Sequence, residues 1–171
     1  MKTTLNAIRE HSPCADSWKK LLEHLGKTKA DDEPLLVSTI HASNGLDDSL
    51  WALRAVDGFY CEKRLFAVWC ARQVQHLMGD PRSIAALDVA ERFANDEASA
   101  EELAAARDAA GAAAGAVAWD AARNAARNAA GDAARDAARN AAWAAQSKKF
   151  LKLCAITESG ESVPSVFWSV R

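Results

Sequence analysis

Few residues in this sequence have the types and spacing of a catalytic or metal-binding site. His11 and Cys14 are separated by two residues, which is compatible with half of a zinc site. No second compact pair of cysteine or histidine residues follows, so we expect a loop histidine, a buried cysteine, and no bound metal or other cofactor. The chain also lacks the glycine-rich, GxSxG and HExxH motifs of common enzyme classes. We therefore predict that the protein is not an enzyme.

A denser group of charged and aromatic residues begins at Asp47. Asp47 and Asp48 precede Trp51 and Arg54, and Arg64 follows ten residues after Arg54. One interpretation is a polar pocket near Trp51, Arg54 and Arg64 that binds a small molecule or a substrate. Another is that the two acids stabilise the positive end of a helix and Trp51 packs into the core. Because Trp and Arg are frequent anchors of protein interfaces, a third interpretation is a surface that binds a protein partner.

A row of arginines in the C-terminal half could contact the phosphates of a nucleic acid. Residues 101–146 hold five arginines against six acidic residues, a net charge of −1, and the whole chain carries −2. Since nucleic-acid binding depends on a net excess of positive charge, we do not expect this function but keep it as an alternative. The five are Arg107, Arg123, Arg127, Arg135 and Arg139.

These arginines stand in an alanine-rich segment that predicts one long helix over residues 97–154. Between residues 103 and 146 the sequence contains 24 alanines in 44 residues and no proline. Alanine has the highest helix propensity of all residues. Three glycines weaken the helix by roughly 1 kcal/mol each, and we expect any bend near Gly111–Gly115.

The alanine pairs recur every four residues, and this period has a geometric consequence. Each group of four advances about 40° beyond a full turn, so the alanine stripe moves around the helix. No single neighbour can cover such a stripe. We expect several helices, or a second copy of the chain in a homodimer, to pack closely against it, for example at Ala126 and Ala130.

The remaining sequence predicts a single all-α domain. Residues 1–96 form a body of short antiparallel helices packed with the long alanine-rich helix, and residues 155–171 form a docked tail. Ser12–Pro13, Asp31–Pro34 and Asp80–Pro81 are typical of helix N-termini. No alternating apolar run predicts a sheet.

Composition also bears on the expected location of the chain. The first residues do not show the charged and apolar pattern of a signal peptide, so we expect none, and no apolar run reaches the roughly 18 residues that a membrane span requires. We therefore expect a soluble cytoplasmic protein without membrane contact. The scattered cysteines are interpreted as small buried apolar residues rather than disulfide partners. These are Cys14, Cys61, Cys70 and Cys154.

Between roughly His11 and Gln146 the chain resembles the immunity-protein-5-like family, small bacterial and mobile-element proteins named as immunity proteins. The stretch from Asn44 to Arg54 is the most specific part of the resemblance. The matching residues are His11-x-x-Cys14-x-x-x-Trp18, Leu25-Gly26-Lys27, Ser43-Asn44-Gly45-Leu46-Asp47-Asp48-x-Leu50-Trp51-x-Leu53-Arg54, Arg64-Leu65-Phe66-Ala67, Asp80-Pro81-Arg82, and the alanine-, arginine- and tryptophan-rich run.

The resemblance implies a protein that neutralises an effector by direct, stoichiometric binding. The effector would be a toxin, or a host defence nuclease such as a CRISPR complex if the chain is a phage or mobile-element inhibitor. No catalytic residue of the family can be transferred to this sequence. The candidate partner-binding residues are Asp47, Asp48, Trp51, Arg54, Arg64, Arg82, Arg123, Arg127, Arg135 and Arg139.

Overall fold

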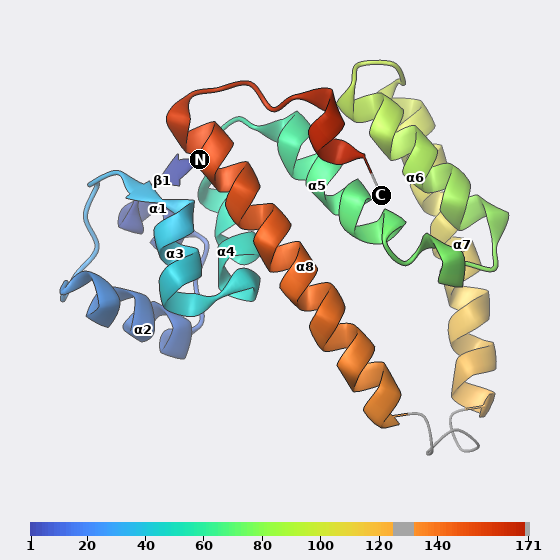
Figure 1. The fold of residues 1–171 in the computed structure, drawn as a ribbon, viewed down its shortest axis with the longest axis horizontal. Coiled ribbons are helices and arrows are strands. Elements are labelled where there is room, and N and C mark those ends of the chain that lie inside the picture. Colours follow the sequence, from blue (N-terminus) through green and yellow to red (C-terminus); the bar gives the residue numbers. More distant parts are fainter. Residues whose placement is uncertain (125–131, 170–171) are drawn as a thin grey trace. The chain divides into compact units, whose positions relative to one another are not determined.

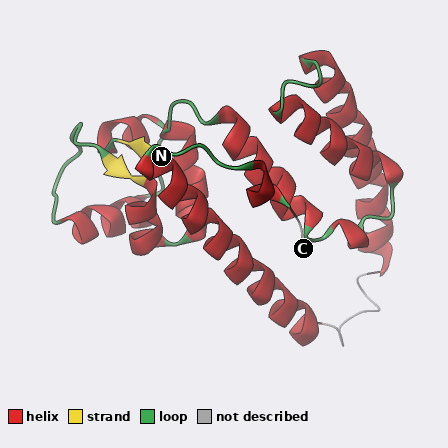
Figure 2. Ribbon diagram, turned by 45° about the horizontal axis from the view of Figure 1, so that its top comes forward, coloured by secondary structure: helices red, strands yellow, loops and turns green. Residues whose placement is uncertain are grey.

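The fold is predominantly helical (Figure 1, Figure 2). The computed structural model describes residues 1–124 and 132–169, and it describes their side chains except those of Leu77 and residues 113–137. Within that part of the chain, eight α-helices accompany short 3-10 turns and one two-stranded sheet, which confirms the predicted all-α fold class. The helices are α1 (Leu5–Glu10), α2 (Ala15–Leu25), α3 (Val37–Asn44), α4 (Leu46–Ala52), α5 (Tyr60–Arg72), α6 (Pro81–Ala94), α7 (Ala100–Asn124) and α8 (Asp132–Ser159).

The chain divides into two compact units where composition predicted one domain. The first unit comprises Met1–Phe59 and Ala145–Pro164, and the second comprises Tyr60–Ala144 and Ser165–Arg171. One boundary therefore falls within α8, which supplies its C-terminal part to the first unit.

The first unit has a core of large aliphatic side chains from short helices. Trp18, Leu22, Leu25 and Trp51 pack around this core while remaining partly exposed. Phe150, Leu153 and Cys154 on α8 are also buried, each with at most 1% of its surface exposed. The central cluster consists of Leu5, Ile8, Leu21, Leu35, Ile40 and Ala52.

Polar contacts connect α8 to α3 within this unit. The Glu158 carboxylate accepts hydrogen bonds from the backbone N–H of Ser38 at 3.2 Å and from its hydroxyl at 2.8 Å. One turn further along α3, His41 Nε2 lies 2.6 Å from Ser147 Oγ. Because these partners are more than one hundred positions apart in sequence, they hold together segments that no local pattern relates.

The prediction that the chain contains no sheet is wrong. β1 (Lys2–Thr3) pairs antiparallel with β2 (Leu35–Leu36), with Lys2 opposite Leu36 and Thr3 opposite Leu35. Two residues per strand are too few to show an alternation of apolar and polar side chains. The pairing depends on contact between distant segments, which only the folded chain provides.

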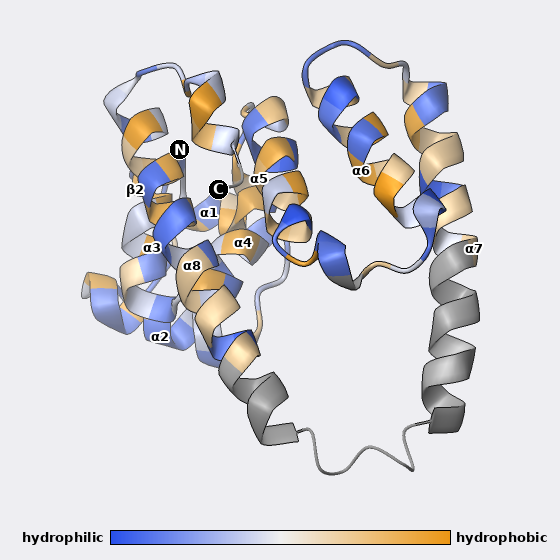
Figure 3. Cartoon of the chain, turned by 45° about the vertical axis from the view of Figure 1, so that its right-hand side comes forward, coloured by the Kyte–Doolittle hydropathy of each residue, from blue (hydrophilic) through white to orange (hydrophobic). Residues whose placement is uncertain are grey.

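In the second unit α6 packs against both α5 and α7. The predicted N-terminus of α6 is confirmed: Asp80 accepts a hydrogen bond from the backbone N–H of Arg82 at 2.9 Å, and Pro81 occupies the first turn. Proline is well suited to this position because the N–H that it lacks would have no partner within the helix. Figure 3 shows both hydrophilic and hydrophobic residues along α6.

Two other predicted helix starts are wrong. Ser12 has a positive φ of 55° and lies outside the helix, and the Cys14 sulfur caps α2 instead by accepting from the Ser17 N–H. The acidic stretch 31–34 precedes β2 rather than a helix, because Lys27 holds Asp31 and Glu33 at 2.6 Å each in the loop.

The alanine-rich segment contains α7 and α8 where one helix over 97–154 was predicted. Residues 125–131, which include Ala126 and Ala130, lie outside the described residues. The predicted close packing or dimerisation through these two alanines therefore stays a prediction. α7 continues through Gly111 and Gly115 without a break. α8 extends to Ser159, beyond the predicted end, and a 3-10 turn at Ser165–Trp168 contacts α5.

Candidate functional site

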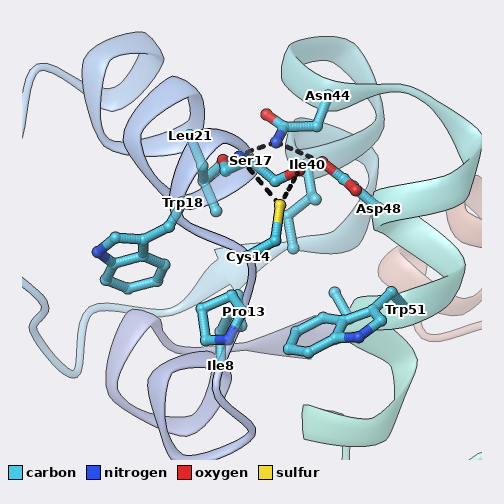
Figure 4. A pocket seen from close by; sticks show the side chains of 11 residues that line it. Ile8, Pro13, Cys14, Ser17, Trp18, Leu21, Ile40, Asn44, Asp48 and Trp51 are labelled. Carbon is cyan, nitrogen blue, oxygen red and sulfur yellow. Dashed lines mark hydrogen bonds between the residues drawn. The ribbon is translucent and has the colours of Figure 1, made fainter.

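The clearest hollow in the first unit lies among α1, α2, α3 and α4. Its volume is about 80 Å³ and most of its lining is apolar. Figure 4 shows the indole rings of Trp18 and Trp51 on either side of Cys14 and Pro13. The lining residues are Ile8, Pro13, Cys14, Ser17, Trp18, Leu21, Ile40, Asn44, Asp48, Trp51 and Ala52, and we call this hollow the Trp18–Trp51 pocket.

Local sequence explains how two of the helices present this lining. On α2, Trp18 and Leu21 are three positions apart and therefore share one face of the helix. On the other side, Asn44 ends α3 and Asp48 lies in the first turn of α4. Gly45 joins the two helices with a φ of 90°, a conformation that glycine adopts more easily than other residues. The turn thereby brings the Asn44 amide and the Asp48 carboxylate together.

Asn44 connects three helices around the pocket (Figure 4). Its Nδ2 donates to the Ser17 carbonyl of α2 at 2.8 Å and to Asp48 Oδ2 of α4 at 2.7 Å. Its Oδ1 accepts from the Ser43 hydroxyl at 2.5 Å. Both hydrogens of the Asn44 amide are therefore donated in hydrogen bonds, which fixes the orientation of the Asn44 and Asp48 side chains.

Cys14 places a thiol inside the pocket. The Ser17 N–H donates to Cys14 Sγ at 3.4 Å, and Ser17 Oγ lies 3.2 Å from the same sulfur. Hydrogen bonding to the Ser17 side chain, and then to its backbone, lowers the pKa of the Cys14 thiol below the ordinary 9.0. The thiolate is consequently easier to form than in an isolated cysteine.

The expectation that all four cysteines are buried is wrong for three of them. Cys14 and Cys61 are exposed, Cys70 is partly exposed, and Cys154 is buried. Burial raises the pKa of the Cys70 thiol to about 11 and that of Cys154 to about 12. A count of cysteines cannot distinguish these environments, because exposure depends on which side of each helix is covered.

Of the predicted site residues in the first unit, two line the Trp18–Trp51 pocket. Asp48 contributes a carboxylate and Trp51 contributes an indole wall. Asp47 is exposed, next to the pocket in sequence but not part of its lining. Arg54 is also outside the lining: its guanidinium carbon lies 4.5 Å from the centre of the Trp51 ring, and its Nε donates to the Trp51 carbonyl at 2.9 Å.

The other two predicted residues with described side chains before α7 belong to the second unit. Arg64 on α5 places its guanidinium carbon 4.6 Å from the centre of the Phe93 ring on α6. Arg82 donates through Nη2 to Asp80 Oδ2 at 2.7 Å, so it supports a helix cap. Around Trp51 the lining of the Trp18–Trp51 pocket is mainly apolar and includes neither arginine. Arg64 belongs to the other unit, so the suggested polar pocket near Trp51, Arg54 and Arg64 stays a prediction.

The predicted arginine row is only partly described. Arg127 lies outside the described residues, and the side chains of Arg123 and Arg135 lie outside the described side chains. Arg139 is exposed on α8. A shared phosphate-binding surface along this row therefore stays a prediction.

A second hollow, of about 290 Å³, lies in the second unit and was not predicted. Arg72 dominates it, with ion pairs to Asp88 at 2.7 Å and to Glu91 at 2.8 Å. Arg72 is thus already neutralised by two acids from α6. We interpret the charged residues that line this hollow as structural ion pairs that connect α5 and α6.

Sequence reasoning overlooked part of the Trp18–Trp51 pocket. Cys14 was predicted as half of a metal pair, and Trp18 and Asn44 entered only through the family resemblance, so the three were not predicted as members of one site. Their convergence depends on how α2 packs against α3, which the structure provides. A helix N-cap cysteine followed by a tryptophan four positions later is the only local signal that could have indicated it.

No helix in the described parts of the chain has the length and apolar character that crossing a membrane requires. Among the same residues, no group of three or more His, Cys, Asp or Glu side chains could hold a metal ion. In comparisons with known proteins, no family model, curated protein or solved structure matches this chain.

Proposed function

We propose that this protein is a non-enzymatic inhibitor that binds a protein effector stoichiometrically and blocks it in the cytoplasm. The effector is a bacterial toxin or a host defence nuclease such as a CRISPR complex. The resemblance of residues 11–146 to immunity proteins motivates the class of function. The Trp18–Trp51 pocket is the surface that we assign to the effector.

The size of the pocket is the observation that carries the proposal. Sites for small molecules and cofactors usually enclose roughly 300–1,000 Å³. The Trp18–Trp51 pocket has about 80 Å³, which is close to the space of one side chain rather than of a substrate or cofactor. Protein interfaces commonly insert single anchor side chains into such hollows, and tryptophan is enriched among the residues that dominate their affinity.

The chemistry of the lining also favours binding over catalysis. Cys14 is a nucleophile, but nucleophilic catalysis by cysteine generally uses an adjacent base to remove and return the proton. The lining residues of the pocket include no histidine or lysine. The polar groups that are present, from Ser17, Asn44 and Asp48, bond mostly to one another and to the backbone, and so fix the shape of the pocket.

The test begins with affinity capture from the native host, using wild-type protein beside Trp51→Ala and Arg82→Ala variants. Arg82 is exposed, lies outside the pocket and was itself predicted to contact the partner, so Arg82→Ala tests whether the partner is recognised there rather than at the pocket. We expect wild type and Arg82→Ala to retain one partner that Trp51→Ala loses, as a truncated anchor commonly costs about 2 kcal/mol or more. Circular dichroism establishes that Trp51→Ala retains its helices.

The captured effector is then purified and titrated with the protein while its own activity is measured. The proposal requires a one-to-one end point at which the toxin or nuclease activity is lost. Capture of a small molecule or nucleic acid without a protein would contradict it. So would a protein partner whose activity and binding are the same with wild type and with Trp51→Ala.

A further inference from the structure

We infer that the Trp18–Trp51 pocket recognises a cationic side chain, a lysine or arginine of the effector. The aliphatic stem would lie against the indoles and the charged end would reach Asp48. This inference rests on the proposed function, because it specifies which chemistry of the effector enters the pocket.

Charge is the first argument. Asp48 is the only residue of the pocket lining with a formal charge at neutral pH, and that charge is negative. Its Oδ2 accepts a hydrogen bond from Asn44, and no described residue donates to its Oδ1. Figure 4 shows the Asp48 carboxylate pointing from α4 toward the sulfur of Cys14. The pocket therefore offers one carboxylate oxygen as an acceptor, held in place by Asn44.

The walls supply the second argument. Ile8, Leu21 and Ile40 form an aliphatic surface, and Trp18 and Trp51 add two aromatic rings. Long cationic side chains bury their methylene groups on such surfaces while the charged end remains bonded. Aromatic rings also attract cations through their negatively polarised faces. The Trp51 ring already makes one such contact within the chain, with the guanidinium carbon of Arg54 at 4.5 Å from its ring centre, outside the pocket lining.

Other occupants fit these features less well. An acidic side chain would meet the Asp48 carboxylate at close range and be repelled. A purely apolar side chain would remove water from that carboxylate without replacing its hydrogen bonds, which is energetically costly. A lysine or arginine side chain can make both interactions: its methylene groups contact the apolar walls, and its charged end pairs with the Asp48 carboxylate.

Cys14 makes the charge preference measurable without the effector. Methanethiosulfonate reagents of similar size carry either an ethylammonium or an ethylsulfonate group. The Cys14 thiolate attacks the reagent sulfur to form a mixed disulfide and releases methanesulfinate, so the added group is placed inside the pocket. Cys61, which is exposed on α5 in the second unit, provides an internal reference in the same sample.

We expect the ratio of cationic to anionic modification rates at Cys14 to exceed that at Cys61 by about tenfold, the effect of one carboxylate a few ångströms away. The rates are read by mass spectrometry of the cysteine peptides. In Asp48→Asn the two ratios should become similar. Any change that this substitution makes to the Cys14 pKa affects both reagents equally and cancels in the ratio.

Equal ratios at Cys14 and Cys61 in the wild type would overturn the inference, as would a cationic preference that persists in Asp48→Asn. Because the experiment needs no partner, it separates the two proposals. If an effector is captured but the pocket shows no charge preference, the proposal of a cationic side chain is wrong and the proposed inhibitor function stands. If the pocket prefers the cationic reagent but no effector is captured, the proposed inhibitor function is wrong and the charge preference stands.

Discussion

The two units achieve stability in different ways. In the first unit the buried side chains are large and come from distant parts of the sequence: Phe150 and Leu153 of α8 are buried in the same unit as Leu5 and Ile40. In the second unit the main packing partners are consecutive helices, α5 with α6 and α6 with α7. In the first unit consecutive helices also pack, α2 with α3 and α3 with α4, but long-range contacts to α8 are added to them, whereas the main packing of the second unit is between neighbours along the chain.

The second unit buries large side chains on α5, among them Leu65, Phe66 and Val68, but most of the covered residues on α7 are small. On α7, Leu103 is buried and Ala106 and Ala110 are partly covered, whereas Ala104 and Ala105 are exposed. Burying an alanine removes little apolar surface from water, and the hydrophobic stabilisation is roughly proportional to that surface. A comparison of matched substitutions should therefore reveal larger losses of stability at the buried leucines of the first unit than at the small residues of α6 and α7 in the second.

The largest effect is expected from Leu153→Ala. Leu153 is 1% exposed, whereas Leu151 on the same helix is 39% exposed. Loss of a fully buried leucine side chain should reduce the free energy of unfolding by about 2–5 kcal/mol. Leu151→Ala should reduce it by less than about 1 kcal/mol. Urea denaturation followed by circular dichroism measures both, and similar losses would mean that Leu153 is not part of a tightly packed core.

The next effect concerns close packing of small residues in the second unit. Ala94 at the end of α6 is 5% exposed. Ala94→Leu should reduce the free energy of unfolding by about 1–3 kcal/mol, because a larger side chain has no space there. Ala104→Leu, on the exposed side of α7, is the matched control and should be nearly neutral. A stabilised Ala94→Leu variant would show that the site contains an unfilled space.

A smaller effect, of opposite sign, is expected at Gly111 within α7. A side-chain carbon added there would have no heavy atom within 4 Å apart from the helix itself and the adjacent residues. Gly111→Ala should therefore stabilise the protein by about 0.5–1 kcal/mol through its higher helix propensity. Thermal melting gives the change directly. A lower melting temperature would indicate that this side of α7 is occupied by another segment or chain.

The smallest effect is a pH dependence at the N-terminus of α6. Hydrogen bonds from the Arg82 side chain, and then from its backbone, lower the pKa of the Asp80 carboxyl from 3.8 to about 2. The folded state therefore favours the charged form of Asp80. The stabilisation of the fold by ionised Asp80 is complete above pH 3.8 and is lost as the pH falls from 3.8 through about 2.

The measurement compares melting temperatures of wild type, Asp80→Ala and Asp80→Asn over that range. At neutral pH the melting temperature of the wild type should be higher than that of Asp80→Ala, and this difference in melting temperature should decrease as the pH approaches 2. Asp80→Asn keeps a side-chain cap without an ionisable group, so its difference from Asp80→Ala should not change with pH. A constant gap between wild type and Asp80→Ala would exclude ionisation of Asp80 as the cause.

Local features of the sequence were sufficient to predict several elements. Asp80–Pro81 predicted the start of α6, and glycine, which adopts a positive φ readily, occupies the C-cap of both α2 (Gly26) and α3 (Gly45). These signals depend on the conformational preference of one residue or on a side chain that bonds to backbone two or three positions away. The all-α class follows from the same kind of evidence, repeated along the chain.

The candidate site could be predicted only in part. Asp48 and Trp51 belonged to the predicted set because charged and aromatic residues cluster there in sequence. Cys14, Trp18 and Asn44 join them only when α2 packs against α3 and Asn44 Nδ2 reaches the Ser17 carbonyl. Arg54 lies over the Trp51 ring of its own chain and outside the pocket lining, and its predicted contact with a partner stays a prediction.

The sequence by itself determined the helical character, the low net charge and the N-terminal cap of α6, since each arises from composition or from interactions within a few residues. The tertiary structure decided the sheet between β1 and β2, the exposure of Cys14 and the shape of the Trp18–Trp51 pocket. It also decided that the C-terminal part of α8 belongs with the first unit. These features require contacts between residues that are far apart in the chain, and their formation depends on the summed packing of many side chains rather than on the preference of any one.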